Sequence, residues 1–177
     1  MSFLSQVGAV FLGVFVTFLV YRLWDWRNAR RQKAVTKQVI SIEIADSMAR
    51  LEAFQSAANE VLDSGSGIQT LYNEVFPLRT FAYDAAFKGG EVRKLDDWTL
   101  EKALHDYVVR CEGFNTEVRL AREALIEKFD SLRDVPPDML RASVRFRLPN
   151  IEDLINRSNT LIKMMMDDSG RPQNPSR

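Results

Sequence analysis

Hydrophobic and polar positions divide the chain into an uncharged N-terminal stretch and a longer part with helical periodicity. From Ser2 to Tyr21, 20 residues carry no charge and 14 of them are apolar. A helix rises about 1.5 Å per residue, so this stretch spans about 30 Å, the hydrocarbon thickness of a bilayer. We therefore expect residues 1–24 to form an N-terminal transmembrane helix.

The residues after this stretch predict a membrane interface and an orientation. Aromatic rings that favour the headgroup level stand beside basic side chains, and these interface residues are Tyr21, Arg22, Trp24, Trp26, Arg27, Arg30, Arg31 and Lys33. Residues 25–37 form a basic collar in which Asp25 is the only acid. Basic residues follow the span and none precede it, which predicts a single-pass protein of the cell (inner) membrane with its N-terminus outside and its C-terminal domain cytoplasmic.

Two other interpretations of the N-terminus fit less well. A cleaved signal peptide would need a basic start and a small-residue cleavage site, and neither is present. A core helix of a soluble protein would have to bury four Phe and no charge along its length. The collar itself has two interpretations, a pure topology signal or a contact with anionic lipid headgroups.

Small residues recur every four positions within the predicted span, at Ser5, Ala9, Gly13 and Thr17. In lipid, small side chains allow two helices to approach closely. The stripe is therefore a candidate self-association face.

After the collar, apolar residues fall at spacings of three and four, which is typical of helices packed along one face. One series is Ile40, Ile44, Leu51, Phe54, Ala58 and Val61, interrupted by Ser47. A second series is Leu100, Leu104, Tyr107, Cys111, Phe114, Val118, Ala121 and Leu125. A third, after Pro149, is Ile151, Leu154, Ile155, Leu161, Ile162 and Met165. The pattern predicts an all-α chain: a transmembrane helix followed by an antiparallel helical bundle, residues 38–166, with long coiled-coil-like helices.

Helix breaks are expected at five places. Residues 63–67 and 88–90 contain the glycines that end helices, and Pro77 divides the stretch 68–87 into two short pieces. Asp96 or Asp97 is expected to cap the long helix that follows. Residues 135–137 are expected to end that helix, and a last helix follows Pro149. Residues 139–148 fit one face of a helix and also alternate like a strand, and we expect a helix there. The polar tail, residues 167–177, is expected to be disordered.

The composition of the chain argues against several kinds of partner and binding site. The 24 basic and 24 acidic residues cancel, which argues against nucleic acid as a partner. One Cys and one His exclude a disulfide framework and a zinc site built from several such ligands. No cofactor, metal or small-molecule substrate is indicated.

Four features of the sequence are candidates for a catalytic or binding role. Glu101 and His105 share a helix face, but their spacing differs from the Glu-x-x-His of di-iron bundles, so we interpret them as a solvated polar face. Cys111 lies in an apolar series and is expected to be a small core residue. Gly89-Gly90 is expected to be a helix stop, since it lacks the residues of a phosphate loop. A basic group, Arg141, Arg145 and Arg147, is expected to pair with acidic faces of neighbouring helices.

One set of residues resembles a pattern in uncharacterised prokaryotic single-pass membrane proteins. It comprises residues 76–83 (FPLRTFAY), Gly89-Gly90, Leu95, Tyr107 and Asn115, together with Ile42-Glu43-Ile44. The resemblance covers roughly residues 1 to 125, and it implies an N-terminal anchor and a cytoplasmic helical domain without an established activity. Within it, Thr80 is a candidate cap for the short helix after Pro77, and Tyr83 and Tyr107 are candidates to pack across a helix pair.

These patterns lead to one expected function and two alternatives. We expect a membrane-anchored interaction or scaffold protein, not an enzyme, whose partners are the lipid bilayer and either its own copies or another protein. The first alternative is a self-assembling membrane-acting effector, such as a toxin or defence component. The second is an enzyme with an unrecognised site near Glu101 and His105.

Overall fold

The computed structural model is helical throughout its regular elements and describes residues 3–64, 77–95 and 97–167. Side chains are described from Phe15 onward, apart from that of Asp167. The elements are α1 (Phe3–Ser64), α3 (Phe81–Lys88), the 3-10 turn η1 (Arg93–Leu95), α4 (Trp98–Phe129), the 3-10 turn η2 (Leu132–Asp134) and α5 (Pro137–Asp167). The predicted all-α class is confirmed, while residues 65–76 and the expected disordered tail beyond Asp167 lie outside the described residues.

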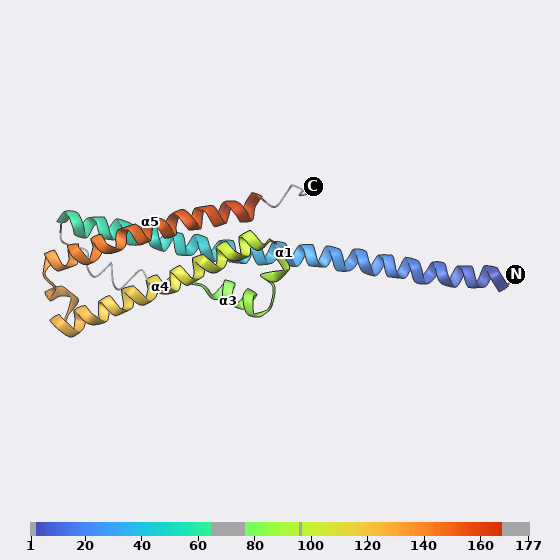
Figure 1. Ribbon diagram of the computed structural model, residues 1–177, viewed down its shortest axis with the longest axis horizontal. Helices are drawn as coiled ribbons and strands as arrows, with labels where there is room; N and C mark the ends of the chain where they lie inside the picture. The colour runs from blue at the N-terminus through green and yellow to red at the C-terminus, as the bar shows by residue number, and fades with distance from the viewer. Residues whose placement is uncertain (1–2, 65–76, 96, 168–177) are drawn as a thin grey trace.

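Helix α1 is a single uninterrupted rod of 62 residues (Figure 1). Its C-terminal half forms a three-helix bundle with α4 and α5, and its N-terminal half projects from that bundle (Figure 1). The predicted end of the first helix at residues 63–67 is confirmed, because α1 stops at Ser64. Within the described part of the chain, no helix is both long enough and apolar enough to cross a membrane.

The three long helices do not all alternate in direction. Ser47 of α1 interacts with Tyr107 of α4, and two turns further along each helix Phe54 meets Phe114 edge to face, with ring centroids 5.8 Å apart. Helices α1 and α4 therefore run parallel. In α5 the order is reversed, since Tyr107 contacts Ser158 whereas Arg110 contacts Asp153. The expectation of an antiparallel bundle thus holds for α5 against its two neighbours, but not for α1 against α4 (Figure 1).

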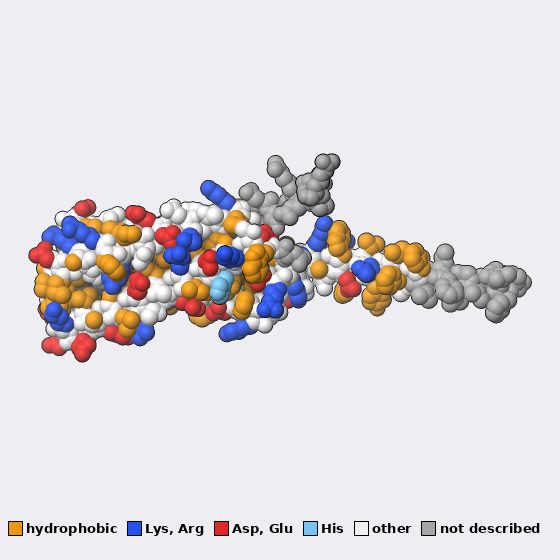
Figure 2. Space-filling view, viewed as in Figure 1, with side chains coloured by type: hydrophobic (Ala, Val, Ile, Leu, Met, Phe, Trp, Pro, Cys, Tyr) orange, Lys and Arg blue, Asp and Glu red, His pale blue; other side chains and the backbone are white. Residues whose placement is uncertain are grey.

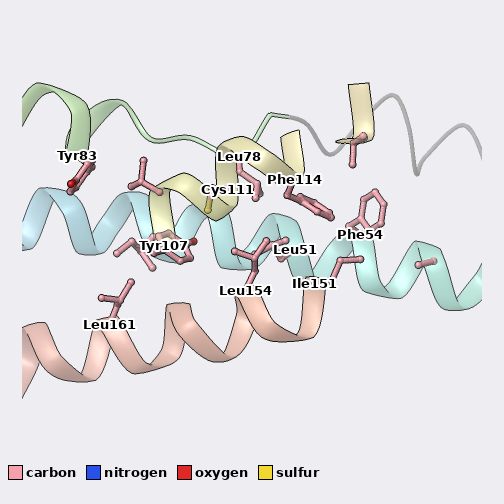
Figure 3. Packing of buried hydrophobic residues seen from close by; sticks show 14 of the residues in the cluster. Leu51, Phe54, Leu78, Tyr83, Tyr107, Cys111, Phe114, Ile151, Leu154 and Leu161 are labelled. Atoms are coloured by element: carbon pink, nitrogen blue, oxygen red, sulfur yellow. The ribbon is translucent and has the colours of Figure 1, made fainter. Parts of the chain in front are cut away.

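The apolar series predicted from the sequence form the core of this bundle (Figure 3). Every member of the first series is buried, and so is Ser47, which interrupts it. The second and third series are buried at the centre and half-buried at Ala121, Leu125, Ile155 and Ile162. Burial of such side chains from water is the main force that holds the helices together, at about 25 cal/mol per Å² of apolar surface.

Two local predictions are confirmed and two are wrong, and one of the wrong ones is the end of the long helix α4, which was expected at residues 135–137 but lies at Phe129. The Asp97 carboxylate accepts a hydrogen bond of 3.0 Å from the Leu100 N–H and caps α4, and α3 ends at Lys88 before Gly89. The expected break at Pro149 is absent, because α5 continues through this residue and absorbs the ambiguous residues 139–148 as helix. Pro149 is exposed, and so is Arg145, whose carbonyl loses its helical partner and remains open to water.

Candidate functional site

Side chains of α1 and α4 hydrogen-bond to the backbone of the segment that lies between these helices in the sequence, residues 77–95, which we call the clamped segment. It contains the short helix α3 and the turn η1 and lies beside α1 and α4 at the end of the bundle from which α1 projects (Figure 1). Its apolar side chains Leu78, Tyr83, Val92 and Leu95 are buried against the core. A helix of eight residues is not stable alone, so its position depends on contacts from α1 and α4.

Asn115 of α4 holds the start of the clamped segment. Its side-chain Oδ1 accepts a hydrogen bond of 2.9 Å from the Leu78 N–H, and its Nδ2 donates one of 3.0 Å to the Leu78 carbonyl. Both backbone groups of Leu78 are therefore paired by one side chain, as they would be by a neighbouring strand. Each such bond contributes about 1 kcal/mol, and the pair fixes the orientation of the backbone.

Helix α1 supplies the cap of α3. The Glu43 carboxylate accepts hydrogen bonds from the Ala82 N–H at 2.7 Å and the Tyr83 N–H at 3.4 Å. The sequence prediction that Thr80 caps this helix is wrong, because Thr80 occupies the cap position but its side chain makes no capping bond. A carboxylate at a helix N-terminus satisfies free N–H groups and also interacts favourably with the helix dipole.

Two further contacts join α1 to the same segment. Ser47 Oγ donates to the Arg79 carbonyl at 3.3 Å, and the Asp46 carboxylate lies 3.9 Å from the Arg79 guanidinium and 3.0 Å from that of Arg50. Glu43, Asp46 and Ser47 lie on one edge of α1 within about one turn of the helix. The residues that carry the resemblance, from Pro77 to Tyr83 with Glu43 and Asn115, are thus brought together in one place.

His105 and Glu101 lie at the outer side of this segment. The Tyr83 hydroxyl is 3.3 Å from His105 Nδ1, and the Phe87 ring stacks on Tyr83 and, at 6.4 Å between centroids, on His105. Burial, and then the negative charges of Glu101 and Asp84, raise the pKa of Tyr83. A tyrosine with a raised pKa stays protonated at neutral pH, so the hydroxyl acts as a hydrogen-bonding group.

Tyr107 lies at the centre of the bundle (Figure 3), where it takes part in a buried polar cluster that joins α4 to α5. Ser158 Oγ lies 3.0 Å from the Tyr107 hydroxyl and 2.9 Å from the Leu154 carbonyl, and Ser47 and Cys111 also contact Tyr107. Burial raises the pKa of Tyr107 and raises the pKa of the Cys111 thiol to about 12. A buried thiol of this kind has no thiolate character at neutral pH, in agreement with the predicted core role of Cys111.

The predicted pairing of Arg141, Arg145 and Arg147 with acidic faces of neighbouring helices is not found among the contacts of the described residues. Arg141 contacts Asp138 at 3.5 Å and Arg147 contacts Ser143, both within α5 itself. The ion pair that does cross between helices joins Arg110 of α4 to Asp153 of α5 at 3.2 Å. Among the described residues, no group of three or more His, Cys, Asp and Glu side chains is placed to hold a metal ion.

The predicted interface residues lie together on the projecting part of α1, where Figure 2 shows hydrophobic and basic side chains side by side. Tyr21, Trp24 and Trp26 are exposed, the Arg22 guanidinium lies 5.7 Å from the Phe18 ring centroid, and that of Arg30 lies 3.8 Å from the Trp26 ring. Arg27 and Arg31 are exposed and Lys33 is half-buried. Of the candidate self-association residues, Thr17 is exposed, while Ser5, Ala9 and Gly13 fall outside the residues with described side chains.

Comparisons with known proteins add no family: no family model, no curated protein and no solved structure matches the chain. The resemblance noted in the sequence therefore stays a prediction.

Sequence reasoning missed the roles of Glu43 and Asn115 and one exposed surface. On the side of α1 opposite the core, Val35, Val39 and Ile42 are exposed by 58%, 49% and 61%. The sequence does indicate this surface, because the three residues are spaced by four and three and Ile42 stands two residues from both Ile40 and Ile44.

Proposed function

We propose that the chain is a membrane-anchored helical interaction protein whose bundle stands at the cytoplasmic face of the cell membrane. The N-terminal part of α1 is its single transmembrane anchor, with the N-terminus outside. One observation carries this proposal: α1 is a continuous helix that joins the 20-residue uncharged stretch, through the basic collar, to the core of the bundle.

The continuity of α1 matters because it leaves no hinge between the anchor and the bundle. The stem formed by residues 22–33 is helical, largely exposed and carries most of the collar. A protein built in this way holds its bundle at a fixed distance and orientation from the lipid, which suits a scaffold that presents a surface to partners in the same membrane. The aromatic and basic side chains of the stem support an interfacial position.

The anchor is tested by placing charge in it. The double variant Val16→Asp and Leu19→Asp is expected to shift the full-length protein from the alkaline-washed membrane fraction to the soluble fraction. A carboxylate costs about 2.5–3.5 kcal/mol at the centre of a span and less toward the end where these two positions lie, so the variant introduces two of them. The matched control, Val109→Asp and Leu120→Asp, changes apolar residues of similar exposure on α4 and should stay in the membrane fraction. A wild-type protein that is already soluble after the wash would overturn the proposal.

The interaction role is tested by chemical cross-linking of the tagged protein in native membranes, followed by purification and mass spectrometry. A dominant foreign partner would assign an adaptor role and define the pathway through that partner. Ladders of the protein's own multiples would support self-assembly and would also favour the alternative of a membrane-acting effector. Recovery of the uncross-linked monomer alone would contradict the interaction role.

A further inference from the structure

The outward surface of α1 is an apolar face that no other described part of the chain covers. Besides Val35, Val39 and Ile42, it includes the exposed residues Ala49 and Ala53, and we call these five residues the outward face. Ile42, Ala49 and Ala53 each stand two residues after a buried core residue of α1, which is about 200° around the helix. Ile42, Ala49 and Ala53 therefore lie opposite the core, while Val39, which directly precedes the buried Ile40, lies at the edge of the outward face.

The outward face repeats at the spacing of a coiled-coil seam. Val35, Ile42 and Ala49 are each seven residues apart, with Val39 and Ala53 at alternate positions. Asp46 occupies an intervening seam position but is already bonded to Arg50 and close to Arg79. The five residues of the outward face are uncharged, and Arg50 and Arg79 of the same copy balance the one carboxylate in the seam, that of Asp46. A face without excess charge suits pairing with an identical face, because two like-charged surfaces would repel each other.

Position along α1 rules out lipid as the occupant of this face. Ile42 lies 21 residues beyond Tyr21, which corresponds to about 30 Å of helix past the end of the predicted span. The bilayer ends well before that point, so the face needs a protein surface.

Register along α1 connects the outward face to the small-residue stripe. At about 100° per residue, Gly13 and Thr17 fall within about 20° of Ile42 around the helix axis, whereas Ala9 and Ser5 lie about 60° and 100° away, so only the C-terminal half of the stripe shares the side of the outward face. Two surfaces suited to helix pairing, one in the anchor and one in the bundle, thus share one side of a continuous helix. A second copy of the chain, inserted in the same membrane in the same direction, presents both surfaces at the same heights.

We propose that two copies of the chain pair in parallel along the outward face of α1, so that Val35, Ile42 and Ala49 of one copy meet the same residues of the other across a two-fold axis. The proposal rests on the proposed membrane anchor, which makes the two helices parallel. It assigns the interface to α1, with Arg79 of the clamped segment at its edge beside Asp46, and leaves α4 on the outside of the dimer, accessible to other partners.

The test is disulfide cross-linking of the full-length protein in native membranes. Single substitutions Val35→Cys, Ile42→Cys and Ala49→Cys are expected to give covalent dimers on mild oxidation, because the equivalent Cβ atoms approach within disulfide range only near a parallel two-fold axis. Asn156→Cys, at an exposed position of α5, is the matched control and should remain monomeric. The native Cys111 is buried and gives no background.

A second substitution distinguishes specific pairing from cross-linking caused by random collisions between monomers. Ile42→Lys should lower the dimer yield of Val35→Cys by about tenfold or more, because two lysines would face each other at the seam. Val109→Lys, at an exposed valine of α4, should leave that yield unchanged. Equal yields at positions 42 and 156, or dimers that form at Thr17→Cys and not at positions 35 to 49, would overturn the inference while the anchor stands. A protein absent from the washed membrane fraction would overturn the anchor and the parallel dimer together.

Discussion

Neither the space around Gly113 nor its backbone conformation requires a glycine at this position. It lies in the middle of α4, and a Cβ atom added there would meet no other atom within 4 Å. Gly90, by contrast, has a φ of +72°, a conformation that residues with a side chain rarely adopt, although space is also open around it. The two glycines therefore isolate the effect of the backbone from that of packing.

We predict that Gly113→Ala raises the free energy of unfolding by about 0.5–1 kcal/mol, since alanine loses less conformational entropy in a helix. Gly90→Ala should lower it by about 1 kcal/mol, because the left-handed conformation is strained for alanine. Urea unfolding of the detergent-solubilised protein, followed by circular dichroism, gives both values. Changes of the same sign in the two variants would contradict the backbone argument.

Cys111 predicts a loss of stability at alkaline pH. Its pKa is raised by burial from 9.0 in the unfolded chain to about 12 in the folded protein. Between these values the unfolded state releases a proton that the folded state keeps, so the contribution is fully present below pH 9 and is lost as the pH rises. The expected slope is about 1.4 kcal/mol per pH unit for this one group.

The measurement is the free energy of unfolding between pH 8 and pH 10, below the range in which the tyrosines of the unfolded chain titrate fully. Wild-type protein should lose stability above pH 9, and Cys111→Ala should show a smaller slope from a lower starting value, because the substitution also leaves a small cavity. An identical slope in the variant would show that another group controls the alkaline transition.

At the scale of elements, α3 depends on a cap supplied by a different helix. Without Glu43, the Ala82 and Tyr83 N–H groups lose their acceptor at the start of an eight-residue helix. We predict that Glu43→Ala speeds hydrogen exchange at residues 82 and 83 by about 5- to 30-fold, equivalent to about 1–2 kcal/mol. Glu52→Ala, which removes an exposed carboxylate elsewhere on α1, is the control. Equal exchange in the two variants would mean that packing alone positions α3.

The elements themselves were predictable where the information is local. The spacing of Ile40, Ile44 and Leu51 places them on one helix face whatever the partner, and Asp97 caps the helix that it directly precedes. Relations between distant segments were not predictable in this way. Nothing near Thr80 indicates that a carboxylate 37 residues earlier is the acceptor, and the periodicity of a helix does not state its direction, so the parallel arrangement of α1 and α4 was missed.

Pro149 illustrates the same limit for breaks. A proline inside a helix removes one hydrogen bond, and from the sequence alone this favours a helix end. In the folded chain, Pro149 and the hydrogen bond that it removes lie on an exposed side of α5. The residues before and after the proline, Val144 and Ile151, are both buried against the same core. Packing along α1 on both sides of the proline therefore keeps α5 in one piece.

At the scale of the whole molecule, the chain is a rod with a bundle around one half. A helix of 62 residues is about 93 Å long, and α4 and α5 accompany only its C-terminal part (Figure 1). Charge follows the same division: residues 22–37 carry six basic and one acidic side chain, a net of +5, so the remainder of this neutral chain carries −5. The basic stem and the acidic bundle give the molecule a polarity along its long axis.

This polarity predicts that the collar, and not the total charge, sets the orientation of the chain in the membrane. Replacing Arg27, Arg30, Arg31 and Lys33 by Gln removes the basic excess within about 15 residues of the span, the range over which basic residues control topology. A fraction of the molecules should then insert with the bundle outside. The control replaces the same number of basic residues on α4, namely Lys102, Arg119, Arg122 and Lys128, all too far from the span to act. In intact cells, an impermeant maleimide should label Asn156→Cys only in the collar variant, because only there does part of the bundle face the outside. Labelling of the control to the same extent would show that the overall charge balance controls insertion, and no labelling of either would show that the rest of the chain fixes the orientation without the collar.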